Sequence, residues 1–387
     1  MFSKDAAITK KMIRGFVALA ALSFALILPN AVGAQAPAAH EAKTKNVLVV
    51  MIDGFRWQEV FHGIDQELLT KPSPDWMGDP KETAARIRAS YVRPTPAESR
   101  RALLPFIWNT MAKQGQIFGN RDLGSDSHVM NGQNFSYPGY AETLTGLADP
   151  RITSNANVPN PNPTVFTWLN RQPGFEGRVA AFGAWEVFNG IFDRDHCGFV
   201  VNAGWDPLTA IPATPELTLL NRLKDETPHV WGDEPFDALP YHTAIEYLKA
   251  RKPRVLFVGL GETDDWAHNG IYTSYLDSAH LADSYIAELW NMVQSMPEYR
   301  GTTTLIVLPD HGRGLGAEWN DHGGSIPASR ETWMAFLGPD TPALGERGAG
   351  TVVTESQVAA TIAALLGQDY RAAVPKSGAP IADVFNQ

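Results

Sequence analysis

Six side chains with the chemistry of metal ligands stand at widely separated places in the sequence. They are three aspartates and three histidines: Asp53 in MIDGF, Asp264 and His268 in ETDDWAHNG, Asp310 and His311 in LPDHG, and His322 in WNDHGG. Carboxylates and neutral imidazoles are acceptors near neutral pH, so gathering six of them without a cation is strongly unfavourable. A bound divalent metal removes this cost, and mixed Asp and His ligation suits zinc. The residue types therefore indicate a metal centre.

Each of these motifs is weak by itself. An aspartate after a strand, such as Asp53, is more often a turn former or a helix N-cap than a ligand. Asp264 and His268 could be an ordinary loop pair, and His322 before two glycines could be a turn residue. The prediction depends on the joint occurrence of the motifs in this order.

The elements that would position these residues follow from the apolar pattern. Continuous apolar runs at 46–52, 179–184, 254–260, 303–308 and 333–338 predict strands of a sheet that is covered on both faces. Amphipathic segments predict helices between them, including 278–293 and 354–367, of which the second starts with the capping-box pair Thr354 and Gln357. This alternation predicts an α/β fold, namely an α/β/α sandwich with a central, mostly parallel sheet.

Three of the predicted strands are followed by the proposed ligands. The carboxyl ends of parallel strands meet at one edge of a sheet, so we expect Asp53, the segment 262–268 and the pair at 310–311 to lie together. The segment 185–245 is rich in Trp, Pro and Asp and lacks clear periodicity. It is interpreted as loops or a small cap over that edge.

The amino terminus has the pattern of an export signal. Basic residues precede an apolar run, and small residues at 32–34 suit a cleavage site before Gln35. We predict a signal peptide at 1–34, a flexible lead-in at 35–45 and one catalytic domain at 46–387, hence an exported protein, periplasmic or secreted. A stable membrane anchor is the alternative, but the apolar run is short and is interrupted at Pro29.

Charge and cysteine content limit the possible partners and the source of stability. The formal net charge of −10 disfavours binding of nucleic-acid duplexes through their backbone. Any positive charge for an anionic substrate must therefore be local, and bound metal is one way to supply it. Cys197 is the only cysteine, so an intramolecular disulfide cannot form.

The order of motifs resembles that of a known family. The motifs occur in the order IDG, SYPGYAETLTG, Asp-x-x-x-His, DHG and His-Gly. This order is similar to that of the alkaline phosphatase superfamily, and most similar to that of its type I phosphodiesterase and nucleotide-pyrophosphatase branch. The resemblance runs from about residue 46 to 340. It implies two zinc ions, one held by Asp53, Asp310 and His311, and the other by Asp264, His268 and His322.

The resemblance also implies a nucleophile between the two ions. The branch has Thr-Phe-Pro at this point, and here Ser136, Tyr137 and Pro138 match it, with Gly146 closing the motif. The sequence departs from the branch by using Ser for Thr and Gly-Tyr for Asn-His at 139–140. Coordination of the Ser136 oxygen to a dication would lower its pKa and activate it. Thr143 and Thr145 are the rival nucleophiles.

The sequence also offers candidates for substrate contacts. The family places an Asn roughly twenty residues after the nucleophile, which here points to Asn155 or Asn157, and either could instead stabilise a turn. Arg313 and Arg56 stand next to proposed ligands and could contact substrate charge or form salt bridges.

The combined prediction is an exported hydrolase of small phosphoric esters that works through a phosphoserine. A sulfatase, phosphonate hydrolase or phosphomutase on the same fold is the alternative; Ser136 lacks the Cys/Ser-x-Pro-x-Arg pattern of sulfatases. A serine hydrolase would need Gly-x-Ser-x-Gly, which NFSYPG does not match. A binding module without catalysis would be expected to lack ligands. The sequence leaves monoesterase and diesterase open.

Overall fold

The computed structural model describes residues 42–71 and 78–385, which belong to one compact unit spanning Glu41–Gln387. The predicted signal peptide at 1–34 and residues 35–41 of the lead-in lie outside the described residues. Thr44, near the end of the lead-in, is buried, and its N–H donates to Asp340 Oδ2 over 2.7 Å. Within the described part, no helix is both long enough and apolar enough to cross a bilayer.

The centre of the fold is a sheet in the order β5-β4-β6-β1-β7-β8-β2-β9. Its strands are β1 (Asn46–Ile52), β2 (Gln116–Phe118), β4 (Val179–Gly183), β5 (Val200–Ala203), β6 (Val255–Leu260), β7 (Thr303–Leu308), β8 (Met334–Leu337) and β9 (Gly345–Glu346). Strands β5, β4, β6, β1 and β7 pair in parallel, whereas β8 runs antiparallel to both of its neighbours. A separate parallel pair joins β3 (Asp126–His128) to β10 (Val352–Thr354).

The central strand β1 shows why the apolar runs are continuous. Alternate side chains point to opposite faces of a strand. Leu48, Val50 and Ile52 pack into one core, and Val47, Val49 and Met51 into another. All of the residues of β1 are buried. Both faces of the sheet are therefore covered.

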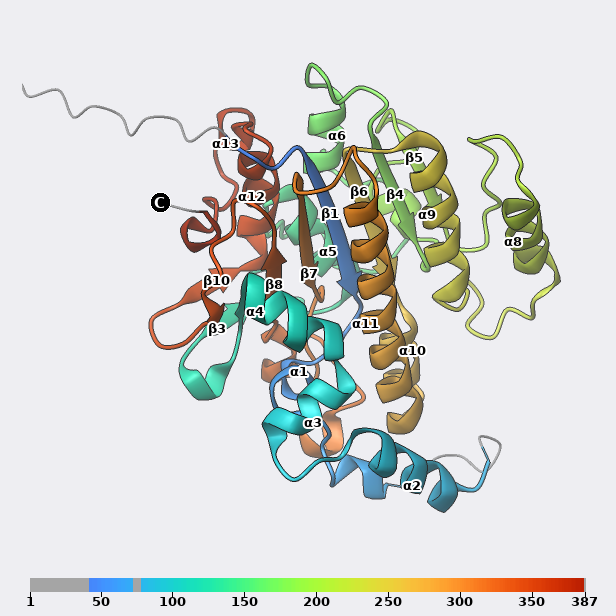
Figure 1. Cartoon of the computed structure of the whole chain (residues 1–387), viewed down its shortest axis with the longest axis vertical. Helices are drawn as coiled ribbons and strands as arrows, with labels where there is room; N and C mark the ends of the chain where they lie inside the picture. The colour runs from blue at the N-terminus through green and yellow to red at the C-terminus, as the bar shows by residue number, and fades with distance from the viewer. Residues whose placement is uncertain (1–41, 72–77, 386–387) are drawn as a thin grey trace, which may run out of the picture. The chain divides into compact units, whose positions relative to one another are not determined.

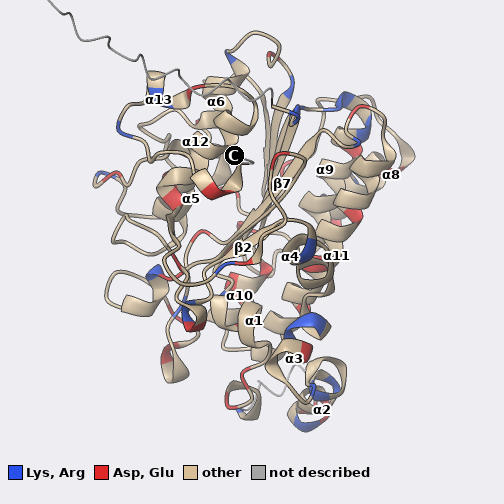
Figure 2. Ribbon diagram, turned by 60° about the vertical axis from the view of Figure 1, so that its left-hand side comes forward, with Lys and Arg blue, Asp and Glu red and all other residues tan. Residues whose placement is uncertain are grey.

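Helices cover both faces of the sheet, and others lie beyond its carboxyl edge or outside these layers (Figure 1). The helices are α1 (Trp57–His62), α2 (Pro80–Tyr91), α3 (Pro96–Leu103), α4 (Ala112–Gln114), α5 (Ser136–Thr145), α6 (Val165–Asn170), α7 (Phe188–Ile191), α8 (Pro215–Glu226), α9 (Ala238–Arg251), α10 (Glu262–His268), α11 (Tyr272–Ser295), α12 (Val358–Leu365) and α13 (Tyr370–Ala373). Residues of α9 and α11 enter the first core, and residues of α5, α6 and α12 enter the second. Figures 1 and 2 show the sheet between these two layers.

The predicted fold class is confirmed: the structure is an α/β/α sandwich with a mostly parallel sheet. The five predicted strands correspond to β1, β4, β6, β7 and β8, with ends that differ by at most one residue. The capping box is also present, because the N–H of Thr354 donates to Gln357 Oε1 over 3.0 Å.

The segment 185–245 differs from the expectation of loops or a small cap. It supplies α7, the edge strand β5, α8 and the start of α9. Strand β5 has four residues, and α8 buries only Leu217 and Lys224, so neither element leaves a clear apolar period in the sequence. Loops within the segment do approach the proposed ligands: Glu234 Oε1 lies against Gly261, just before α10.

Candidate metal centre

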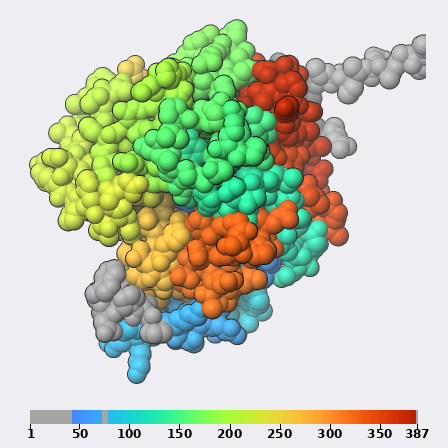
Figure 3. Space-filling view, turned by 180° about the vertical axis from the view of Figure 1, so that it is seen from behind, coloured from blue at the N-terminus to red at the C-terminus, as the bar shows by residue number. Residues whose placement is uncertain are grey.

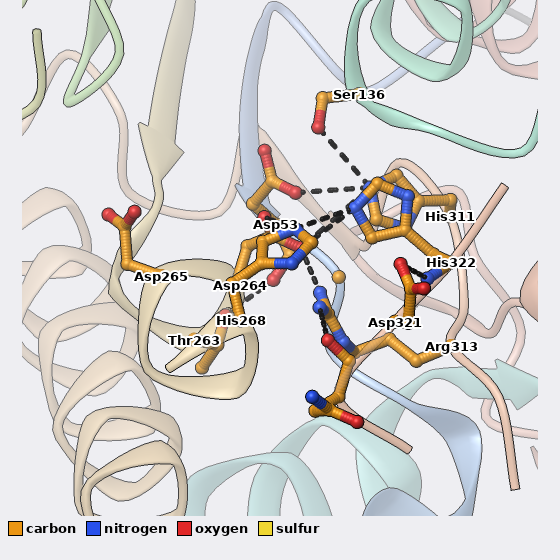
Figure 4. Close-up of polar contacts among 12 residues, drawn as sticks. Asp53, Ser136, Thr263, Asp264, Asp265, His268, His311, Arg313, Asp321 and His322 are labelled. Carbon is orange, nitrogen blue, oxygen red and sulfur yellow. Dashed lines mark hydrogen bonds and ion pairs between the residues drawn. The ribbon is translucent and has the colours of Figure 1, made fainter. Parts of the chain in front are cut away.

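The six proposed ligands meet at the carboxyl ends of three adjacent strands. Asp53 follows β1, the helix α10 with Asp264 and His268 follows β6, and the pair at 310–311 follows β7. These strands are neighbours in the order β6-β1-β7, which brings their ends together. His322 reaches the same place from the loop after β7, and Figure 4 shows the side chains converging.

The imidazole of His311 is the centre of the first group. It is fully buried, and its Nδ1 lies 2.9 Å from the Gly312 carbonyl oxygen, to which it donates. This bond leaves the lone pair on Nε2, the tautomer that a metal ligand needs. Nε2 faces Asp53 Oδ1 at 3.3 Å, Asp310 Oδ2 at 3.2 Å and Ser136 Oγ at 3.3 Å.

The two carboxylates of this group each carry an oxygen without a partner. Asp53 Oδ1 and Asp310 Oδ2 are buried and accept no hydrogen bond. Their other oxygens are bonded, Asp53 Oδ2 to the Tyr140 hydroxyl at 3.0 Å and Asp310 Oδ1 to the Gly54 N–H at 3.0 Å. Buried, unpaired carboxylate oxygens are costly. A dication between them and His311 would satisfy both.

The second group joins α10 to the loop after β7. His268 Nε2 lies 3.0 Å from Asp264 Oδ2 and 2.9 Å from His322 Nε2. Asp264 Oδ1 is 3.6 Å from His322 Nε2 and 4.0 Å from His311 Nε2, so Asp264 belongs to both groups. The donor atoms of Asp264, His268 and His322 lie close enough together to hold one ion, as do those of Asp53, Asp264 and His311.

The pKa values of the proposed ligands are shifted because these groups are buried close together. Burial raises the pKa of Asp53 and of Asp310 well above the usual range. The next cause is the charge of Asp264 for Asp53 and the charge of Asp53 for Asp310. Burial lowers the pKa of His311 to about 4 and that of His322 to about 2. His311 and His322 are therefore neutral and able to bind a metal at neutral pH, whereas the pKa of His268, in spite of its burial, is raised by the hydrogen bond and the charge of Asp264. Asp53 and Asp310 need a cation to ionise fully.

Of the two roles considered for Arg313, substrate contact and salt bridge, the structure has the salt bridge. Its side chain is fully buried rather than open to substrate. It donates to the carbonyl oxygens of Trp319 and Asn320 at 3.2 and 2.8 Å and is ion-paired with Asp264. Its donors are thus directed at the protein, and it holds Asp264. Gly54 is required beside it, since a Cβ there would lie 2.6 Å from Arg313 Nη1.

Ser136 is the first residue of α5 and points at the first group (Figure 4). Gly139, three residues later in the motif, lets α5 lie close to Asp310, because a Cβ at 139 would lie 2.2 Å from the Asp310 carbonyl oxygen. The rival hydroxyls point elsewhere: Thr143 Oγ1 donates to Gly139 O at 3.0 Å, and Thr145 Oγ1 to Ala141 O at 2.6 Å. Of the three hydroxyls, only that of Ser136 lies beside the proposed ligands.

The two candidate asparagines are placed differently. Asn155 Oδ1 accepts the N–H of Tyr137 at 2.9 Å, so its side chain lies next to Ser136 and its amide N–H₂ is left for another partner. Asn157 lies against α7 instead, where a Cβ on Gly190 would come within 3.0 Å of its Oδ1. The geometry favours Asn155 for a substrate contact.

Residues that sequence reasoning missed surround the ligands. Tyr140, at a position where the sequence departs from the resembled branch, donates to Asp53 Oδ2, and Thr263 Oγ1 donates to the Asp53 carbonyl at 2.5 Å. Glu234 and Asp265 bring further carboxylates, each with a buried oxygen that has no partner. Burial and the charge of Asp265 raise the pKa of Glu234 well above its usual value. Tyr140 could have been found as the departure from the motif; the others left no signal.

Comparison with known proteins identifies the fold. No protein-family model matches the sequence, and no curated protein matches it. Wild-type alkaline phosphatase PafA is similar in structure, with a TM-score of 0.56 and 11% identity over 89% of this chain and 99% of that chain. A putative sulfatase from Bacteroides thetaiotaomicron VPI-5482 has a TM-score of 0.56 and 12% identity, covering 89% and 75%.

A third similar structure is phosphonate monoester hydrolase SpPMH from Silicibacter pomeroyi. Its TM-score is 0.52 and its identity 14%, over 87% of this chain and 76% of that chain. The chain thus shares its fold with an alkaline phosphatase, the fold that the motif order predicted. These neighbours do not single out the phosphodiesterase and nucleotide-pyrophosphatase branch.

Proposed function

On the basis of this alkaline-phosphatase-like fold, we propose that the chain is an exported, metal-dependent hydrolase of small phosphoric esters that acts through Ser136. The observation that carries the proposal is the position of Ser136 Oγ, 3.3 Å from His311 Nε2 and in front of two buried carboxylate oxygens without partners. The export signal predicted at 1–34 supports the location, and the acidic charge supports a small ester rather than a nucleic-acid duplex as substrate.

The donor set fits two divalent ions, most simply zinc. Asp53, Asp310 and His311, with Ser136, would hold one, and Asp264, His268 and His322 the other. When bound, such ions lower the pKa of the serine hydroxyl and stabilise charge on the attacking and leaving oxygens. Imidazole nitrogens mixed with carboxylate oxygens are the ligands that zinc prefers.

Ser136 would carry the covalent step. Its hydroxyl gives up its proton and the oxygen forms a bond to phosphorus while the bond from phosphorus to the alcohol oxygen breaks; that oxygen takes up a proton as the alcohol leaves. Water then cleaves the ester between Ser136 and phosphorus, which restores the hydroxyl and releases the phosphate product. Asn155, oriented through its bond to the Tyr137 N–H, would donate to a phosphoryl oxygen during both steps.

The charge around the site favours diesters over monoesters. A monoester has an additional negative charge that needs a cation beyond the metals. Both arginines next to the ligands already have partners in the protein. Arg313 is ion-paired with Asp264, and Arg56 donates to Glu59 and to the Gly314 carbonyl oxygen. Glu234 and Asp265 bring no positive charge either, and Asp265, whose pKa burial raises to about 8, becomes negative beside Asp53 as the pH rises past that value. A singly charged diester needs no further cation and is repelled less by Asp265 when it is ionised.

A sulfatase reaction is less well supported. In the sulfatase pattern the residue four positions after the nucleophile is Arg, and here it is Tyr140, whose hydroxyl is bonded to Asp53. The same motif offers no cysteine at 136.

Rates on a matched pair of substrates test the proposal. The zinc-loaded protein should hydrolyse bis(p-nitrophenyl) phosphate faster than p-nitrophenyl phosphate, and a chelator should abolish both activities. Ser136→Ala should lower kcat about 1,000-fold or more while it keeps bound metal. Thr145→Val is the control and should retain activity. Full turnover by Ser136→Ala, or in excess chelator, would contradict the proposal.

A further inference from the structure

Residues 129–135, named here the nucleophile loop, connect β3 to Ser136 and are fixed by a buried carboxylate. Glu142, on the second turn of α5, is fully buried. It accepts the N–H groups of Met130 and Asn131 at 2.9 Å and the side-chain amide of Asn131 at 2.9 Å. The loop is thus tied to the helix whose first residue is Ser136.

The loop is also fixed internally and against the second metal group. Asn131 Oδ1 accepts the N–H groups of Gln133 and Asn134 at 2.8 and 2.9 Å. The Gly132 carbonyl oxygen lies so near Gly324 that a Cβ there would be 2.7 Å away. Gly324 belongs to the loop after β7 that carries His322. Figure 3 shows the segment after β7, in orange, beside the blue-green segment that leads into α5.

Asn134 is the strained residue of this loop. Its φ is +53°, which non-glycine residues seldom adopt and which asparagine tolerates best. It is 5% exposed, and its Oδ1 is buried without a hydrogen-bond partner. A strained backbone and an unpaired buried amide at the same residue are features of ligand-binding positions.

The backbone relates Asn134 to the nucleophile. Phe135, between them, is extended, with φ −147° and ψ 175°. Because a single extended residue separates them, the Cα atoms of Asn134 and Ser136 lie about 7 Å apart. A tetrahedral phosphoryl group on Ser136 Oγ fits within the reach of an asparagine side chain at that separation.

We propose that the side-chain amide of Asn134 binds a nonbridging oxygen of the phosphoryl group at Ser136, as a second amide beside that of Asn155. A half-turn about the Cβ–Cγ bond exchanges the two ends of the amide and presents its N–H₂ to that oxygen. Glu142 and Asn131 hold the loop, so the amide is positioned before substrate arrives. This inference rests on the proposed function.

Asn134→Gly removes the side-chain amide and leaves the backbone conformation intact, because glycine accepts the positive φ without strain. With bis(p-nitrophenyl) phosphate, kcat/KM should fall about 10- to 100-fold. Binding of inorganic phosphate to the zinc-loaded protein, measured by calorimetry, should weaken as well, and the unfolding temperature should not fall. Asn134→Asp should lose more activity, since a carboxylate repels the phosphoryl oxygens.

Lys252→Gly is the matched control, because Lys252 also has a positive φ, +50°, at the end of α9. It should leave kcat/KM and phosphate binding unchanged. If Asn134→Gly hydrolyses the diester and binds phosphate as the wild type does, Asn134 serves only the backbone and the inference is wrong, while the proposed function stands. If the zinc-loaded wild type does neither, the proposed function fails and the inference with it.

Discussion

The Nε2 atoms of His268 and His322 lie 2.9 Å apart, although one residue ends α10 and the other belongs to the loop after β7. Two imidazole lone pairs at this separation repel each other unless a proton or a cation lies between them. Asp264, 3.0 Å from His268 Nε2, completes an arrangement that favours a cation.

Metal addition should therefore stabilise the protein. For the metal-stripped chain, zinc at about 100 times its Kd should raise the free energy of unfolding by about 2.7 kcal/mol for each site. His322→Ala should bind one ion fewer than the wild type in a calorimetric titration. His196→Ala is the control, because His196 is exposed and pairs with Asp193. An unchanged stoichiometry in His322→Ala would argue against the second metal group.

Tyr140→Phe should weaken metal binding without disturbing the fold. The hydroxyl donates to Asp53 Oδ2, and the ring packs against Phe188 and Phe257. Loss of a bond that orients a ligand typically costs about 10- to 100-fold in metal affinity. Competition with a chelator measures this loss. Tyr299→Phe, which removes a buried hydroxyl bonded to the Pro253 carbonyl, should leave metal affinity unchanged.

The fold and the ligand set could be predicted because both follow from local pattern. A strand covered on both faces must be apolar throughout, as β1 is, and ligands that follow parallel strands must meet at one edge. The direction of β8 was not predictable, since a single apolar run has the same composition in either orientation.

Contacts between distant segments left no trace in the sequence. The burial of Arg313 depends on carbonyl oxygens of the loop at 319–320, which no residue type reveals. The approach of Glu234 to Gly261 depends on the loop between α8 and α9, in a segment whose composition predicted only irregular structure. The position of Asn134 depends on its φ, which asparagine permits and does not require.

Removing negative charge beside Asp53 should shift the substrate preference at a pH where that charge is present. Burial and neighbouring acids raise the pKa of Asp265 to about 8, so Asp265→Asn removes a charge above this pH and none well below it. At pH 9 the monoester should gain relative to the diester, because its additional charge is repelled less; a several-fold fall in the ratio of the two kcat/KM values is expected there, and little change at pH 7. Glu288→Gln makes the same charge change at an exposed position of α11 and should leave the ratio unchanged. An equal ratio in both variants at pH 9 would remove the electrostatic argument for diesters.

Glu142 should make the stability of the metal-free protein depend on pH. Burial raises its pKa to about 7 from an ordinary value of 4.5. Between these values the folded chain holds the proton and the unfolded chain does not, so the stabilising contribution is complete below about pH 4.5 and is lost as the pH rises to about 7. Glu142→Gln cannot titrate, and the pH dependence of the remaining groups cancels in a comparison of the two proteins. The excess of the wild-type unfolding free energy over that of the variant, measured with urea, should therefore shrink by about 3 kcal/mol between pH 4.5 and 7. A difference that stays constant or widens over this range would show that the bonds from the nucleophile loop keep Glu142 ionised in spite of its burial.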